Sequence, residues 1–306
     1  MNANIYWSVY KNIESELIEL SNMIHIDDKQ LEVYSIKLVE LLIRTVVEVE
    51  SISKELYFQN GGMKVNDNNL FFDADCLDLL ENKWLLSKKQ VIVSAHNFYF
   101  DLPENKLLTP LKKANKKGTS SSDWLRAYQA VKHNRAQSLC KGNLKHLIRA
   151  LAGLYVLNIY YKNNSYELGK DGTGTNFDQS LGSSLFSIKK HINQKVSVES
   201  VYNKNTDYDE CVYLIKQTDE TRQKVLNAIK TIEDKTKEKI IIELLSKLDK
   251  QSIGVPISSQ KEIQLKEELE KIKNEKFEII AKEQRHLLFT AFNELKYLAV
   301  LNKQQY

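Results

Sequence analysis

The sequence predicts a mainly α-helical protein with small β elements and a long C-terminal helical hairpin. Three observations lead to this prediction. Only 10 glycines and 3 prolines occur in 306 residues, and both residue types interrupt helices. Apolar residues recur at helical spacing in long stretches of the first half of the chain. In the last third, charged residues alternate with a narrow apolar stripe, a pattern typical of paired helices.

Two amphipathic helices are expected before residue 60. Residues 3–25 place apolar side chains at helical spacing, which indicates the first helix. Asp27 and Asp28 are candidate N-caps for the second helix, which is expected to run to about Tyr57. The glycine pair at 61–62 ends it.

The middle of the chain is expected to alternate short elements with two further helices. Residues 73–86 indicate a short helix, and the β-branched and aromatic run 91–100 predicts a short strand. Residues 103–121 form a basic and then small-polar connection. A helix capped by Asp123 is expected to reach about Leu139, and an apolar helix over 144–161 follows it as a buried core element.

The chain is expected to divide into three parts. Residues 1–165 form a helical bundle, 166–207 a connector of loops and short strands, and 208–306 a charged helical hairpin. The two helices of the hairpin are expected over 208–250 and 259–302, with a break at Gly254 and Pro256.

Composition excludes several classes of protein. The formal net charge of +4 is too small to indicate nucleic-acid binding by itself. The three cysteines are widely spaced and form no CxxC pair, so neither a zinc site nor a disulfide framework is expected. No apolar run approaches the ~20 residues of a membrane span. We therefore expect a cytoplasmic protein that has no metal, cofactor or membrane partner.

The candidate functional centre lies between residues 123 and 161. Arg126 and His133 are seven residues apart, so on a helix they share a face within about 20°. Gln129 lies between them. Further polar and cationic residues adjoin His133 in the sequence: Lys132, Asn134 and Arg135.

These residue types suit chemistry on a phosphodiester. A histidine with a pKa near neutrality can transfer protons at physiological pH. An arginine can hold phosphate oxygens with two hydrogen bonds and stabilise developing negative charge. Neither role requires a metal ion.

The segment W-x3-Y-x2-VKHNR, followed by NLKHLIRALAGLYVLNIYY, resembles uncharacterised bacterial proteins with a HEPN-like fold, several of them linked to abortive infection. The resemblance covers roughly residues 30–165. It implies a helical bundle and, in many members, a dimeric, metal-independent endoribonuclease. The usual family signature is an arginine, four to six residues and then a histidine, and Arg126 and His133 match this spacing.

The resemblance implies an antiphage toxin that cleaves RNA by transesterification, in which the 2′-hydroxyl attacks the adjacent phosphorus. His133 would act as general base or acid, Arg126 or Arg135 would stabilise the phosphorane, and Lys132 would hold the backbone. Two copies would face each other in a homodimer. Asn134, Gln129 and a basic stretch are candidate RNA contacts, the stretch comprising Lys112, Lys113, Lys116 and Lys117. Glu50 and Lys54 are candidates to support the site residues without contacting the RNA themselves.

Structural interpretations stay open for each of these residues. A histidine, lysine and arginine at a helix C-terminus can simply bond the last carbonyls. Glu50 and Lys54 fit a solvated i, i+4 pair, and the lysine run fits a solvated connection. Ala127 stands where the family has a polar residue, which favours a second hypothesis. This is a non-catalytic HEPN-like module that binds a partner protein or nucleic acid, with the C-terminal helices as the adaptor.

Overall fold

The computed structural model describes residues 4–63, 69–193, 202–248 and 259–306. These residues form two compact units, which we describe separately. The first unit comprises Met1–Glu167, Thr173–Lys216 and Leu298–Tyr306, and the second comprises Leu168–Gly172 and Gln217–Tyr297. The last nine residues therefore belong to the first unit, although the helical region precedes them in the sequence.

The prediction of a mainly α-helical bundle is wrong, because the chain is mixed α/β. Helices make up 57% of the structure and strands 12%, and the described strands form three small sheets. The physical reason is that short apolar segments pair with partners far away in the sequence. Helical periodicity reports only contacts within one segment, so it does not detect such pairing.

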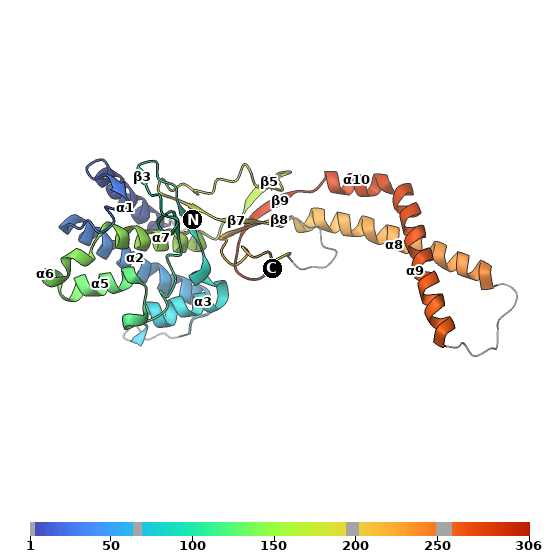
Figure 1. Ribbon diagram of the computed structural model, residues 1–306, viewed down its shortest axis with the longest axis horizontal. Helices are drawn as coiled ribbons and strands as arrows, with labels where there is room; N and C mark the ends of the chain where they lie inside the picture. The colour runs from blue at the N-terminus through green and yellow to red at the C-terminus, as the bar shows by residue number, and fades with distance from the viewer. Residues whose placement is uncertain (1–3, 64–68, 194–201, 249–258) are drawn as a thin grey trace. The chain divides into compact units, whose positions relative to one another are not determined.

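The four longest helices that the structure describes in the first unit pack together. They are α1 (Ile5–Ser21), α2 (Ile36–Gln59), α5 (Asp123–His133) and α7 (Leu144–Lys162). α2 lies between α1 and α5, and α7 contacts all three (Figure 1). α7 is buried along almost its whole length, as its continuous apolar sequence predicts.

The second helix begins later than its predicted N-cap. Ser35 is the N-cap of α2, and its side chain accepts a hydrogen bond from the amide of Leu38 at 3.2 Å. Asp27 instead accepts from the amides of Lys29 and Gln30, at 2.8 and 3.1 Å. Asp27 therefore closes a turn, and Asp28 accepts hydrogen bonds from the amides of Asp101 and Leu102. The prediction that one of these two aspartates caps the second helix is wrong.

In place of the single helix predicted over 73–86, the structure has three short helical segments of different pitch. A π-helical turn, η2 (Phe72–Leu77), leads into α3 (Asp78–Trp84), and a 3-10 turn, η3 (Leu86–Lys88), follows. Leu85 lies between them with a φ of 53°. A left-handed residue cannot continue an α-helix, so the direction of the chain changes at this point.

The predicted helix over 123–139 is interrupted at Asn134. α5 ends at His133, and a short helix, α6 (Arg135–Ser138), begins after Asn134. A 3-10 turn, η5 (Leu139–Lys141), then leads to α7. Asn134 has φ −145° and ψ 71°, outside the helical region, so Arg135 does not continue the face of α5.

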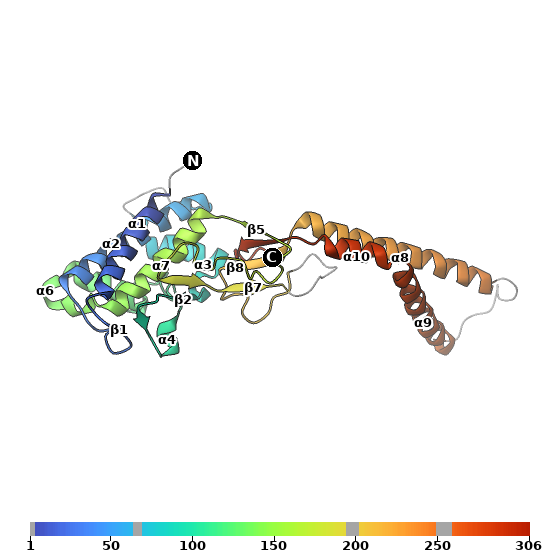
Figure 2. The same cartoon turned by 90° about the horizontal axis from the view of Figure 1, so that it is seen from above.

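The sheets are built from short strands. Parallel strands β1 (Ile26–Asp27) and β3 (Phe98–Tyr99) form the first sheet. The second has the order β4-β2-β6 and contains β4 (Leu107–Leu108), β2 (Val91–Val93) and β6 (Phe186–Ile188). Both pairs in it are antiparallel, and the short helix α4 (Pro103–Lys106) contacts β2 (Figure 2).

The third sheet has the order β5-β9-β8-β7. Its strands are β5 (Tyr166–Gly169), β9 (Tyr297–Leu301), β8 (Tyr213–Gln217) and β7 (Lys190–Ile192). β8 lies where the first C-terminal helix is predicted to begin, and β9 lies where the second is predicted to end. Those helices are therefore shorter than predicted.

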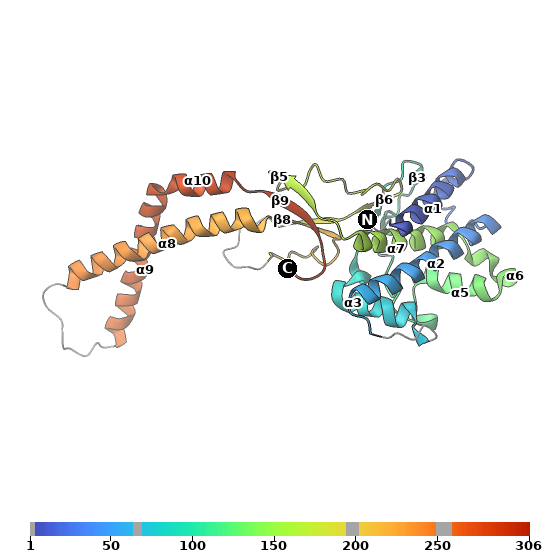
Figure 3. The same ribbon diagram turned by 180° about the vertical axis from the view of Figure 1, so that it is seen from behind.

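The helices of the second unit are α8 (Asp219–Leu248), α9 (Ser259–Glu283) and α10 (Arg285–Asn293). α8 packs against both α9 and α10 (Figure 3). Ion pairs join them, with 2.9 Å between Lys239 and Glu283 and 2.8 Å between Lys224 and Glu294. Gly254 and Pro256, the predicted break of the hairpin, lie outside the described residues.

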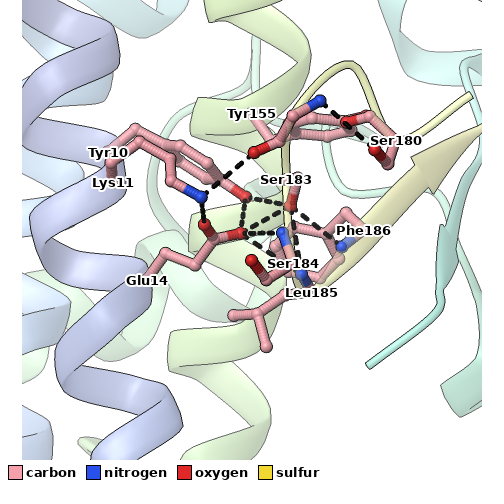
Figure 4. Close-up of polar contacts among 10 residues, drawn as sticks. Tyr10, Lys11, Glu14, Tyr155, Ser180, Ser183, Ser184, Leu185 and Phe186 are labelled. Atoms are coloured by element: carbon pink, nitrogen blue, oxygen red, sulfur yellow. Dashed lines mark hydrogen bonds and ion pairs between the residues drawn. The ribbon is translucent and has the colours of Figure 1, made fainter. Parts of the chain in front are cut away.

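A buried carboxylate holds residues 183–185 against α1. Glu14 is 1% exposed, and its Oε1 accepts hydrogen bonds from the hydroxyls of Tyr10 and Ser183 at 2.9 and 2.6 Å (Figure 4). The amides of Ser184 and Leu185 donate to the same oxygen at 2.8 and 3.2 Å. Lys11 pairs with the other carboxylate oxygen. The buried charge is compensated by these four hydrogen bonds and by the ion pair with Lys11.

Candidate functional site

The start of α5 is fixed by a buried tryptophan and an ion pair. Trp124 is 1% exposed, and its indole Nε1 donates to the carbonyl of Pro110 at 2.8 Å. Asp123 accepts from the amide of Trp124 at 2.8 Å and pairs with Arg149 of α7. These contacts hold α5 against both α7 and the connection before it, so side chains further along α5 project from a rigid base.

Arg126 anchors the loop that precedes α5. Its Nη1 donates to the carbonyls of Thr119 and Ser121, at 3.0 and 2.6 Å. The residue as a whole is exposed. Arg126 is therefore a loop-positioning residue as well as a surface cation.

An open hollow of about 530 Å³ lies beside α5, and we call it the His133 hollow. Arg126, Gln129 and His133 line it from one face of α5, as their spacing predicts. Lys117 lines it from the preceding loop, with its ammonium nitrogen 3.1 Å above the centre of the Phe71 ring. The hollow thus contains a histidine, an arginine and a lysine, with Asp73 as its acidic residue.

A second hollow of about 360 Å³ also borders Arg126, and we call it the Lys112 hollow. Four cationic side chains line it: Lys112, Lys113, Arg126 and Arg149. Its acidic side chains are Glu104 and Asp123. Arg126 and Ser121 line both hollows, so the two are neighbours.

Several predicted site residues line neither hollow. Lys132 is exposed, with its ammonium 5.4 Å from the centre of the Tyr128 ring. The Asn134 amide donates to Gln137 at 2.7 Å. Arg135 is exposed at the start of α6, because the helix break at Asn134 removes it from the face of α5. The structure therefore separates Lys132, Asn134 and Arg135 from the pair Arg126 and His133.

The remaining predicted residues make contacts elsewhere. Lys116 lies 3.9 Å from Asp78, at ion-pair distance. Glu50 and Lys54 pair with each other on α2 at 3.1 Å. Neither of these two lines either hollow, so their contacts agree with the structural interpretation of a paired helix surface.

Some of the strongly shifted pKa values belong to buried groups that line neither hollow. Burial raises the pKa of Cys76 to about 12, and the nearby charge of Asp75 adds to the effect. Burial and the nearby charge of Asp207 likewise raise the pKa of Cys211 to about 12. Burial lowers the pKa of Lys89 to about 8, and its ammonium donates to the carbonyl of Asp209 at 2.8 Å. The two thiols are therefore protonated at neutral pH and poor nucleophiles.

Sequence reasoning did not single out several residues of the two hollows, among them Phe71, Asp73 and Arg149. Phe71 and Asp73 come from the turn before α3, which no motif marks. Arg149 lies on α7 among apolar residues, and it reaches the Lys112 hollow because α7 packs against α5. The opposite charges of Asp123 and Arg149, which form an ion pair, are a signal in the sequence that could have suggested this contact.

No family model, curated protein or solved structure matches the chain. The helices of the described ranges include none with the length and apolar character to cross a bilayer. Within the same residues, His, Cys, Asp and Glu side chains nowhere gather in threes at a spacing that could hold a metal ion.

Proposed function

We propose that the protein is a HEPN-like endoribonuclease that needs no metal ion and acts at the His133 hollow. One observation is the main support. Arg126, Gln129 and His133 line a single open hollow from one face of α5, together with Lys117. A proton-transferring group and cationic groups thus border the same space, which is what cleavage of a phosphodiester requires.

The chemistry is a transesterification. The RNA 2′-oxygen attacks the adjacent phosphorus while His133 accepts the hydroxyl proton or protonates the departing 5′-oxygen. The products carry a 2′,3′-cyclic phosphate and a free 5′-hydroxyl. Nη1 of Arg126 already donates to the carbonyls of Thr119 and Ser121. Arg126 therefore stabilises the negative phosphorane through its other guanidinium nitrogens. Arg135 is less suited to this role, because it lines neither hollow.

The reaction also supports the proposal of a homodimer. Transesterification uses a base for the 2′-hydroxyl and an acid for the leaving oxygen. Each His133 hollow is lined by a single histidine. A second copy that faces the first would supply the other proton-transferring group. The biological setting that follows from the resemblance is an RNA-cleaving toxin of antiphage defence in the cytoplasm.

A second candidate function is a non-catalytic interaction module. Arg126 favours it, because its two bonds to loop carbonyls give it a structural role without any substrate. Ala127, where the family has a polar residue, favours it as well. The second unit could then bind a partner protein through apolar side chains such as Ile241 and Phe289, which are 56% and 66% exposed.

The test is incubation of purified protein with mixed RNA in excess EDTA, followed by analysis of the product ends. The proposal predicts cleavage with 2′,3′-cyclic phosphate ends. Arg126→Ala should lower the rate at least tenfold, whereas Arg135→Ala should leave it near the wild-type value. Intact RNA with wild-type protein would favour the interaction module, and a larger loss in Arg135→Ala would contradict the assignment of Arg126.

A further inference from the structure

We propose that the Lys112 hollow is a second phosphate-binding subsite, which holds an RNA backbone phosphate next to the one at the His133 hollow. This inference rests on the proposed function, because it names a further part of the same substrate site. The two hollows have Arg126 and Ser121 in common, so a strand that crosses Arg126 would enter both.

The charges of the hollow favour an anion. Asp123 is already compensated, because it pairs with Arg149 and accepts from the amide of Trp124. Lys112 and Lys113 are exposed, and neither has an ion-pair partner among the residues that the structure describes. Glu104 is the other carboxylate of the hollow, so four cationic side chains stand against two acidic ones. This net positive charge attracts a phosphate, which releases counterions when it binds.

The turn that presents these lysines is anchored to the core. Pro110 accepts the hydrogen bond from the indole of Trp124, and the side chains of Leu111 and Ala114 are 3% and 1% exposed. The two ammonium groups therefore start from a fixed backbone, which lowers the entropy cost of binding. A solvated, mobile connection would offer no such fixed arrangement.

The start of α5 adds a further reason for an anion at this place. Ser122 is the N-cap of this 11-residue helix, it is 6% exposed, and it lines the Lys112 hollow. Its hydroxyl has no hydrogen-bond partner in the described part of the chain. A phosphate oxygen is the kind of acceptor that this hydroxyl lacks, and the N-terminus of a helix stabilises negative charge.

A subsite away from the reacting phosphate contributes to substrate binding more than to the chemical step. Removing the two lysine charges should therefore raise the KM for RNA and leave kcat within a factor of about two. The effect should be the same for different base sequences, because backbone contacts do not read bases.

The experiment measures binding of a fluorescent 2′-O-methyl RNA dodecamer, which cannot be cleaved, as a function of KCl concentration. The double variant Lys112→Gln/Lys113→Gln is compared with wild type and with Lys106→Gln, an exposed lysine of the same segment that lines neither hollow. On single-stranded RNA, each phosphate that the protein no longer neutralises makes the slope of log K against log salt shallower by about 0.7, so the double variant, which loses one phosphate contact, should show a slope shallower by about 0.7. Lys106→Gln should match wild type.

Two results would overturn the subsite. One is a double variant whose affinity and salt slope equal those of Lys106→Gln, and the other is wild-type protein that does not bind the dodecamer. Cleavage of ordinary RNA is measured separately. Retained cleavage with equal slopes would remove only the subsite, whereas a shallower slope without any cleavage by wild type would remove the nuclease proposal and leave a binding site for RNA.

Discussion

At the scale of single residues, Glu14 illustrates how one buried charge can organise a loop. Its Oε1 accepts from two hydroxyls and two amides, and three of these four donors come from residues 183–185 (Figure 4). Without a carboxylate there, the amides of Ser184 and Leu185 would lose this acceptor. Glu16, two residues further along α1, pairs with Lys37 and Arg44 at the surface and bonds no backbone amide among the described residues.

Glu14→Gln should lower the free energy of unfolding by about 2 kcal/mol, because hydrogen bonds to a buried charged group are removed or weakened. Glu16→Gln is the matched control and should cost less than about 1 kcal/mol, since its ion pairs are exposed to solvent. Denaturant unfolding of both variants measures the difference. Equal decreases would show that the Glu14 network does not stabilise the fold more than a surface pair.

The same network has a defined dependence on pH. Burial by itself raises the pKa of Glu14, but hydrogen bonds from Lys11, Ser183, Ser184 and Tyr10 outweigh it, and the pKa is lowered overall. A carboxyl whose folded pKa is lowered stabilises the protein fully above its ordinary pKa. That contribution disappears as the pH falls through the folded value. The stability gap between wild type and Glu14→Gln should therefore close in acid.

At the scale of secondary structure elements, the sequence predicts the long buried helices well and the pairing of strands poorly. The apolar run 144–161 corresponds to α7 (Leu144–Lys162), because a helix buried all round is a local pattern. Where β8 and β9 lie, periodicity wrongly predicts the ends of the two C-terminal helices. It does so because the two strands pair with each other across some 80 residues of sequence, and periodicity reports only local contacts. Strand partners of this kind are fixed by tertiary packing, which periodicity does not report.

In the candidate site too, local features could be predicted from the sequence and contacts between elements could not. Seven-residue spacing correctly places Arg126 and His133 on one face of α5, because both lie within one uninterrupted helix. The break at Asn134 could not be foreseen from helix propensity, and it removes Arg135 from that face. Arg149 and Phe71 reach the hollows through packing between elements, so no local pattern marks them.

Gly142 is expected to control how the turn before α7 docks on α2. A Cβ at this position would lie 3.1 Å from the Cα of Val39 and closer still to its Cγ2. Gly142→Ala should therefore destabilise the protein by about 1–3 kcal/mol, because backbone has to move. Gly153→Ala is the control within α7, where the nearest atom, Leu111 Cδ2, would lie at 3.4 Å.

Thermal unfolding of the two glycine variants distinguishes the positions. Gly153→Ala should stay within about 1 kcal/mol of wild type, since alanine favours a helix interior over glycine. A neutral Gly142→Ala would mean that the close approach of this turn to α2 is not required.

At the scale of the whole molecule, the chain combines a mixed α/β unit with a second, mainly helical unit. The two hollows lie entirely within the first unit, and the exposed apolar side chains Ile241 and Phe289 lie in the second. If the proposed function holds, the first unit would bind RNA at the two hollows and the second unit would present these apolar side chains to a partner protein.

A homodimeric nuclease makes a prediction about concentration. If both copies supply His133 to the reaction, the rate per mole of protein should rise with protein concentration and level off once dimers predominate. Sedimentation velocity over the same range should show the dimer forming in parallel. A rate per mole that stays constant down to concentrations where only monomer sediments would contradict the shared site.

The most direct test of the central claim is the initial rate of RNA cleavage in excess EDTA for wild type, His133→Ala and His96→Ala. His96 is also an exposed histidine and lines neither hollow. The account predicts that His133→Ala lowers the rate at least about 100-fold, the usual contribution of a general acid or base, and that His96→Ala keeps the wild-type rate. Equal rates for the two variants, or no cleavage by wild type, would contradict the claim that His133 transfers protons in an RNA-cleaving site.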